Sequence, residues 1–176
     1  MRGWAAFWAT FVVALVLIPV GQVAEEAGQP SPVNACLATG SGVSQSTGSA
    51  SCTATGSGSA AAVVGSGSSA AATGGDGNLA SAFGTLSDAI ASDGNGNTAT
   101  VIGNGSGADT GSGDGNTATV IGDDSMAEAE LGDDNTATVV GDDSFADAEE
   151  GDNNTATTVG DGSDADAIDA TTIRPR

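Results

Sequence analysis

Hydrophobic and polar residues alternate in two short phrases that recur along the second half of the chain. The first phrase reads Asn-Thr-Ala-Thr-Val-Ile-Gly, the second reads Ser-x-Ala-x-Ala, and both return every 19 residues. Copies of the first begin at Asn97, Asn116, Asn135 and Asn154, and copies of the second begin at Ser125, Ser144 and Ser163. Alternation predicts β-strands, and Thr, Val and Ile favour strand over helix. A fixed period of this length predicts coils stacked on one another.

Glycine, in the regular copies followed by Asp or Asn, separates the phrases, as expected of turns. The glycines fall in two columns of the 19-residue frame, one at Gly65, Gly84, Gly103, Gly122, Gly141 and Gly160, the other at Gly56, Gly75, Gly94, Gly113, Gly132 and Gly151. Degenerate copies at 59–65 and 78–84 extend the frame backwards. We therefore predict an all-β fold, a parallel β-solenoid (β-helix or β-roll) over residues 59–169, with two short strands per coil, about six coils and a tail at 170–176.

The alternation also predicts which side chains point inward. In the second phrase the Ser/Ala face lies inside, because Glu128 and its equivalents belong in water. The first phrase allows two registers. We favour Asn97, Ala99 and Val101 inside, since alanines let two walls approach and stacked asparagines can hydrogen-bond along the column. The alternative register places the Thr-x-Thr-x-Ile face in the core.

The favoured register leaves a flat, uncharged outer wall. It consists of Thr98, Thr100, Ile102, Thr117, Thr119, Ile121, Thr136, Thr138, Val140, Thr155, Thr157 and Val159. An exposed line of apolar residues flanked by hydroxyls is typical of a contact surface. Threonine is also simply common on strand surfaces, so the rows admit a purely structural interpretation.

The N-terminal part differs from the repeats. Residues 1–24 combine Arg2 with a long apolar run, which predicts a secretory signal peptide, cleaved after Ala24 or Ala27; an uncleaved anchor is the alternative. Residues 25–58 are rich in Gly, Ser and Ala and form either a cap or a partly disordered segment. The chain has 2 cysteines, Cys36 and Cys52, and in an exported chain they predict one disulfide.

Composition limits the classes of partner and activity that the protein can have. A net charge of −20 argues against nucleic acid and anionic lipid as partners, and we expect no membrane contact once the signal is removed. There is no histidine, and no carboxylate stands apart from its neighbours, so we expect neither an enzyme nor a cofactor. The expected location is secreted or at the cell surface, and the expected partner is a second copy or an extracellular surface.

Two motifs resemble known repeat families. Gly-x-Gly-Asn-x-Ala-x-Val at 94–101 and 113–120, together with Ser-x-Ala-x-Ala, resembles the curlin repeat of bacterial functional amyloids. Val-Ile-Gly-Asp-Asp-Ser-Met-Ala at 120–127 resembles the head repeats of trimeric autotransporter adhesins. These resemblances imply an exported bacterial β-solenoid that assembles into extracellular fibres or acts in adhesion.

Two other functions stay open. The Thr-x-Thr rows look like those of ice-binding solenoids, which would make the protein an ice- or surface-binding module. Stacking also brings turn carboxylates together, and carboxylates are ligands that Ca²⁺ takes. The candidate calcium residues are Asp114, Asp123, Asp133, Asp142, Asp152 and Asp161. The second alternative is therefore a calcium-stabilised secreted repeat protein.

Overall fold

A computed structural model describes residues 33–42 and 44–167. These residues form strands and turns, and no helix among them could cross a membrane. The predicted signal peptide at 1–24, residues 25–32 and the tail at 170–176 lie outside the described residues.

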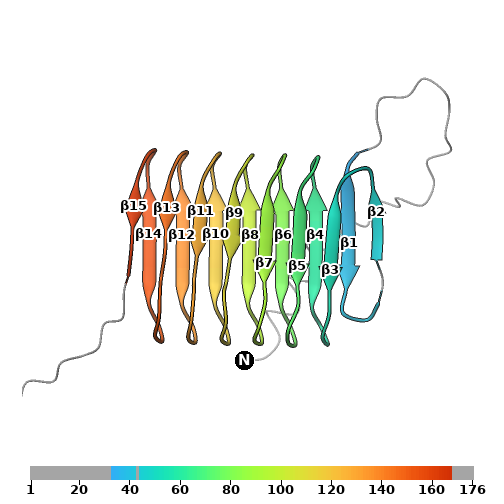
Figure 1. Cartoon of the computed structure of the whole chain (residues 1–176), viewed down its shortest axis with the longest axis horizontal. Coiled ribbons are helices and arrows are strands. Elements are labelled where there is room, and N and C mark those ends of the chain that lie inside the picture. Colours follow the sequence, from blue (N-terminus) through green and yellow to red (C-terminus); the bar gives the residue numbers. More distant parts are fainter. Residues whose placement is uncertain (1–32, 43, 168–176) are drawn as a thin grey trace, which may run out of the picture. The chain divides into compact units, whose positions relative to one another are not determined.

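The strands form two sheets that run the length of a stack (Figure 1). Sheet A contains β2 (Ser44–Thr47), β1 (Ala35–Thr39), β4 (Ala60–Val64), β6 (Leu79–Phe83), β8 (Thr98–Ile102), β10 (Thr117–Ile121), β12 (Thr136–Val140) and β14 (Thr155–Val159), in that order. Sheet B contains β3 (Ser51–Ala54), β5 (Ser69–Ala72), β7 (Asp88–Ala91), β9 (Gly107–Asp109), β11 (Met126–Glu128), β13 (Phe145–Ala146) and β15 (Asp164–Ala165).

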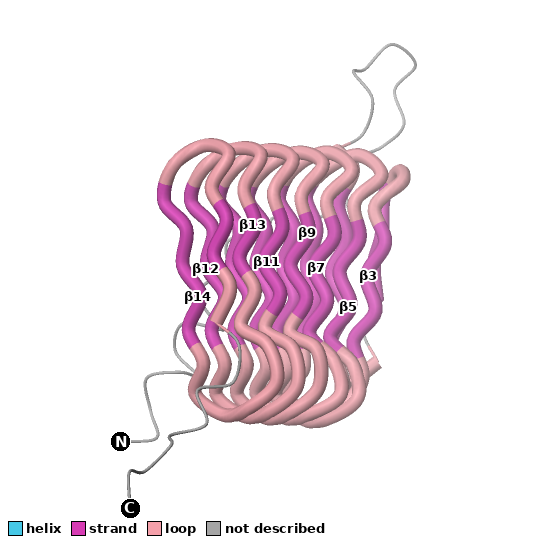
Figure 2. The backbone as a smooth tube through the Cα atoms, turned by 60° about the vertical axis from the view of Figure 1, so that its left-hand side comes forward, coloured by secondary structure: helices cyan, strands magenta, loops and turns pink. Residues whose placement is uncertain are grey.

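Consecutive coils stack in register, as the repeat predicts. From β4 onward each strand pairs in parallel with the strand of the next coil, so that Thr98 pairs with Thr117 and Thr117 with Thr136. The turns align along both edges of the stack (Figure 2). The predicted parallel β-solenoid of about six coils is therefore confirmed.

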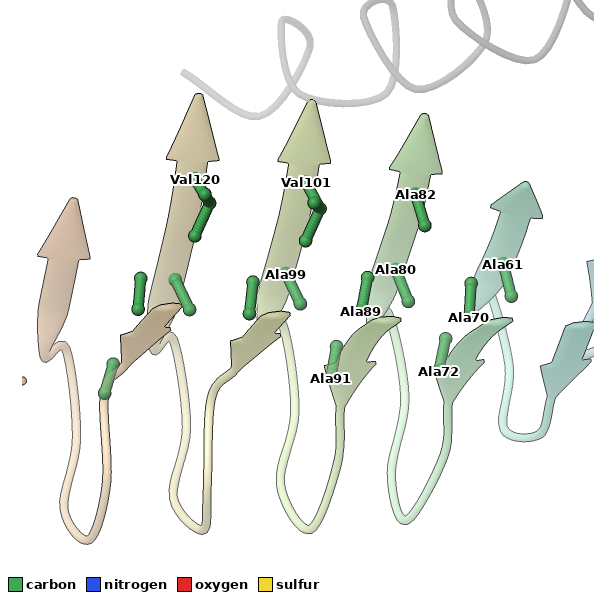
Figure 3. Packing of buried hydrophobic residues seen from close by; sticks show 14 of the residues in the cluster. Ala61, Ala70, Ala72, Ala80, Ala82, Ala89, Ala91, Ala99, Val101 and Val120 are labelled. Carbon is green, nitrogen blue, oxygen red and sulfur yellow. The ribbon is translucent and has the colours of Figure 1, made fainter. Parts of the chain in front are cut away.

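The core is thin and made of small residues. Ala99 and Val101 of sheet A are fully buried, as are Ala89 and Ala91 of sheet B (Figure 3). Alanine on both walls lets the two sheets approach each other closely. Asn97 is fully buried as well. The register with Asn, Ala and Val inside is the correct one, and the alternative with Thr-x-Thr-x-Ile inside is wrong.

The N-terminal end departs from the repeat. Strand β1 pairs with β4 in antiparallel fashion, with Leu37 opposite Ala62, and Figure 1 shows the two arrows pointing in opposite directions. Strand β2 then pairs with β1 and forms the edge. Sheet A thus extends two strands beyond β4, whereas sheet B extends one strand beyond β5. The described part of 25–58 is a cap, and its edge is stepped.

The predicted disulfide joins the two sheets of this cap. Cys36 lies in β1 and Cys52 in β3, with a Cα–Cα distance of 5.8 Å and a sequence separation of 16. Closing a loop of this size stabilises by about 3 kcal/mol in the loop-entropy model. The disulfide therefore fastens β1, which runs antiparallel to β4, to β3 of the other sheet.

We expect the Cys36→Ser/Cys52→Ser variant to lose this stabilisation only near the cap. In a repeat stack each coil contacts only its neighbours, so the loss should fade along the axis. Hydrogen exchange would show faster exchange of β1 and β3 amides by roughly a hundredfold, with β12 amides unchanged. Equal acceleration along the whole stack would contradict this prediction.

Candidate functional site

The outer side of sheet A carries the threonine–isoleucine face. We define it by the outward residues of β8, β10, β12 and β14, namely Thr98, Thr100, Ile102, Thr117, Thr119, Ile121, Thr136, Thr138, Val140, Thr155, Thr157 and Val159. Its apolar row is exposed: 48% for Ile102, 45% for Ile121, 39% for Val140 and 77% for Val159. All twelve residues of the predicted wall lie on this one face.

The face has a regular spacing. Its equivalent side chains lie one strand spacing apart, about 4.8 Å, and successive outward residues of one strand lie about 6.7 Å apart. Leu79, Ser81 and Phe83 of β6 pair with the first threonine strand, β8. Ser81 is only 4% exposed, however, so β6 does not extend the exposed threonine rows.

The face carries no charge over its whole length. None of the eight strands of sheet A contains an acidic or basic residue. The outer side of sheet B is different, because Asp109 of β9 pairs with Glu128 of β11, and Asp88 and Asp164 lie in β7 and β15. Two unlike walls were predicted, and the structure has them.

A column of buried asparagines holds the coils in register beneath the face. The side chain of Asn97 accepts a hydrogen bond from the backbone N–H of Asn116 at 2.8 Å. Its Nδ2 donates to the carbonyls of Ser92 at 2.9 Å and Gly113 at 2.8 Å. The same pattern recurs at Asn78. Each such amide is hydrogen-bonded at both ends, as a buried polar group must be.

A second column, of serines, lines the opposite turn. Ser106 Oγ donates to the carbonyl of Gly122 at 2.8 Å and accepts from the backbone N–H of Ser125 at 3.2 Å. The glycines that supply these carbonyls lie so close that a Cβ on Gly103 would overlap the carbonyl oxygen of Gly122. The glycine columns are therefore required by close stacking and not only by the turns.

The acidic wall carries carboxyls with raised pKa values. Burial raises the pKa of Glu128 above its ordinary value of 4.5, and neighbouring carboxylates, foremost Glu130 and Asp147, raise it further. Burial and Asp166 likewise raise the pKa of Asp147. Parallel register contributes after burial, since it places like charges such as those of Asp109 and Glu128 one strand spacing apart.

These shifts predict how stability depends on pH. A carboxyl whose pKa is higher in the folded state binds its proton more tightly there, so the free energy of unfolding falls as the pH rises from 4.5 through the folded pKa. We expect Glu128→Gln to raise the unfolding free energy at pH 7 by about 0.5 kcal/mol, allowing for solvent screening, and by less at pH 5. Thermal unfolding followed by circular dichroism measures both.

Glu150→Gln is the matched control. It removes the same charge from an exposed residue that lies beyond the stacked strands. The equivalent residue one coil earlier is Leu131, so no carboxylate stacks on Glu150 from that coil. An equal gain from both variants, or a Glu128→Gln gain independent of pH, would contradict the role of stacking.

The six candidate calcium residues lie in two columns, one at each turn. Each accepts a hydrogen bond through Oδ1 from a backbone N–H of the preceding coil. The donor–acceptor pairs are Asn95–Asp114 at 2.6 Å, Asp114–Asp133 at 2.8 Å, Asp133–Asp152 at 3.1 Å, Asn104–Asp123 at 2.7 Å, Asp123–Asp142 at 2.8 Å and Asp142–Asp161 at 3.2 Å. Across residues 33–42 and 44–167 no group of three or more acidic, Cys or His side chains could hold a metal ion. Calcium binding stays a prediction, without a preformed site to support it.

Comparison with known proteins identifies no relative: no family model, no curated protein and no solved structure matches the chain. The solenoid architecture that the curlin and autotransporter-head resemblances imply is confirmed. Membership of either family is not shown, and function must be argued from the faces of the solenoid.

Proposed function

We propose that the protein is an exported, non-enzymatic structural protein of the cell surface or extracellular space, which self-associates through its threonine–isoleucine face. One observation carries the proposal. In a chain of net charge −20, the eight strands of sheet A have no charged residue and expose the row that includes Ile102 and Ile121. Apolar rows exposed on a soluble solenoid are typical of interaction surfaces.

The coil ends are the weaker candidate for association. End-to-end stacking needs two ends of the same shape, so that both sheets continue together. At the C-terminal end of the described stack, β14 and β15 belong to one coil, whereas at the other end sheet A reaches one strand further than sheet B. A second copy stacked there would pair with one sheet and leave the other a strand spacing, about 4.8 Å, away.

A matched pair of variants tests the contact face. Ile121→Asp places a carboxylate on the threonine–isoleucine face, and Met126→Asp places one on the outer side of sheet B in the same coil, where Met126 is similarly exposed at 39%. We expect Ile121→Asp to weaken self-association by about a hundredfold or more, because association would bury unpaired charges. Met126→Asp should leave it unchanged.

Sedimentation velocity of the full-length gene product, purified from the exported fraction, supplies the measurement. Its intact mass would also show whether the N-terminal segment is removed. Retention of the full chain inside the cell, or no association at any concentration, would contradict the proposal.

Binding to an ordered extracellular surface such as ice is the second candidate. It is favoured by the in-register threonine rows, in which Thr98, Thr117 and Thr136 pair in sequence and Thr100, Thr119 and Thr138 lie beside them. A monomer that shows thermal hysteresis, lost in Thr119→Asp, would favour this function over self-association.

A further inference from the structure

The strands of sheet B shorten toward the C-terminal end of the stack, whereas those of sheet A do not. Strands β5 and β7 contain 4 residues each, β9 and β11 contain 3, and β13 and β15 contain 2 (Figure 2). Every strand of sheet A from β4 to β14 contains 5. The two sheets belong to the same coils, so the cause of the shortening must lie in sheet B itself.

The shortening removes a particular hydrogen bond between coils. Where the strands of sheet B end, a backbone N–H donates to the carbonyl 20 residues earlier, at 3.1 Å for Thr110 and 3.0 Å for Ala129. Among the described residues the equivalent N–H of the next coil, that of Ala148, makes no such bond to the carbonyl of Glu128. The ladder is therefore interrupted between β11 and β13.

Stacked carboxyls coincide with this interruption. One outward row of sheet B is uncharged in β5 and β7, where Ala71 pairs with Ile90. From there on the row is acidic, with Asp109, Glu128, Asp147 and Asp166 at intervals of 19 residues. Like charges one strand spacing apart, about 4.8 Å, repel each other. The strands are thus shortest where the row is acidic on both sides.

A second row accounts for the place at which the ladder fails. Between β9 and β11 one carboxyl pair stacks, Asp109 with Glu128, and the hydrogen bond survives. In the next coil Asp147 follows Glu128, and Glu149 follows Glu130 as well. Two carboxyl pairs therefore stack between β11 and β13, and the hydrogen bond is absent there.

These carboxyls have no compensating partner, unlike those of the turns. The turn aspartates Asp133 and Asp142 each accept a backbone N–H of the preceding coil at 2.8 Å. Asp147 Oδ1, by contrast, is buried and has no hydrogen-bond partner among the described residues. Residues 33–42 and 44–167 also contain no Lys, Arg or His. Within this part of the chain no basic side chain can neutralise the rows.

Every charged group that faces Glu128 and Asp147 is itself a carboxyl. Sheet A packs against sheet B from inside and has no charged residue in its strands. Burial raises the pKa of both groups first, and their neighbours raise it further. The neighbours are Asp109, Glu130, Glu149, Asp164 and Asp166. Protonation in acid thus removes repulsion and breaks no ion pair.

We propose that the junction between β11 and β13 is a pH-sensitive seam, which is open at neutral pH and closes when Glu128 and Asp147 take up protons. In the closed state the N–H of Ala148 donates to the carbonyl of Glu128, and both strands lengthen toward the four residues of β7. The switch goes beyond the proposed function, because it changes the acidic wall and leaves the threonine–isoleucine face in place.

The direction of the switch follows from linkage. A carboxyl whose pKa is raised in the closed state stabilises that state fully below its ordinary pKa, which is 4.5 for Glu128 and 3.8 for Asp147. This contribution is lost as the pH rises through the raised value. Opening is therefore expected as the pH rises from 4.5 toward neutrality.

Residue-resolved amide hydrogen exchange tests the seam in the full-length chain, diluted until it is monomeric. Protection factors at pH 5 and pH 7 remove the intrinsic effect of pH on exchange. We expect the protection of the Ala148 amide to fall by about tenfold between the two pH values. The amides of Ala129, whose bond is already made, and of Val139 in sheet A should change little.

Two double variants separate the stacked carboxyls from net charge. Glu128→Gln/Asp147→Asn should raise the protection of Ala148 at pH 7 to its value at pH 5. Asp133→Asn/Asp142→Asn removes the same charge from the turns and should leave the pH dependence unchanged. Asparagine fits those columns, because Asn95 and Asn104 already accept the equivalent backbone N–H groups at 2.9 Å.

The outcomes that contradict the seam are distinct. Equal protection of Ala148 at both pH values, whether high or low, would overturn it. An equal change at Val139 would show that pH acts on the whole stack, and loss of the pH dependence in Asp133→Asn/Asp142→Asn would assign the effect to net charge. Because the sample is monomeric, each result leaves the proposed self-association to its own test.

Discussion

Gly103→Ala is expected to lower the free energy of unfolding by about 3 kcal/mol or more. A Cβ on Gly103 overlaps the carbonyl oxygen of Gly122, which accepts a hydrogen bond from Ser106 at 2.8 Å. The overlap is with backbone, so no side chain can move aside. The added methyl must separate two coils, and chemical denaturation followed by circular dichroism would measure the loss.

Gly96→Ala distinguishes stacking from backbone strain. Gly96 lies in a turn of the same coil with φ of +73°, and a Cβ there meets no atom within 4 Å. Its substitution should cost only the left-handed penalty, about 1 kcal/mol. If the two variants lost equal stability, contact between coils would not be the reason for the glycine columns.

Asn97→Ala is expected to cost about 3 kcal/mol as well, for a different reason. It removes the acceptor for the backbone N–H of Asn116 and the donor for the carbonyls of Ser92 and Gly113. The site is fully buried, so water cannot replace these bonds, and each unsatisfied group costs about 1–3 kcal/mol. Urea unfolding of the variant gives the value.

Asn95→Ala is the control two residues away. Asn95 also accepts a backbone N–H, that of Asp76 at 2.9 Å, but its side chain is exposed. Water can take over that bond, so we expect a loss of about 0.5 kcal/mol. Comparable losses at 95 and 97 would mean that the buried column does not set the stability of the stack.

The coils could be predicted from the sequence, because each coil repeats the same pattern of inward and outward residues. Residues 19 apart lie on top of one another, so Asn97 must stack on Asn116, and Glu128 fixes the outward side of its strand. The sequence leaves two registers open for the first phrase, because Thr and Val suit either face of a strand. The burial of asparagine decides it: Asn97 finds all its partners inside the stack.

Other features were beyond prediction from the sequence. Alternation in Ala35–Thr39 indicates a strand but says nothing of its direction, so the antiparallel pairing of β1 with β4 could not be foreseen. The asparagine column was expected to bond along the stack, yet its partners are backbone groups and not neighbouring amides. The sequence shows which residues stack on one another but not which of their atoms form hydrogen bonds.

The reversed strand β1 also bears on how the molecule folds. Its neighbours in sheet A are β2 and β4, so it can complete the sheet only after β4 has formed. Its pairs with β4 join Thr39 to Ala60 and Ala35 to Val64, which are further apart in sequence than the 19 residues between stacked coils. Folding of a repeat stack can begin in any coil, and we expect the cap to dock late, onto coils that are already formed.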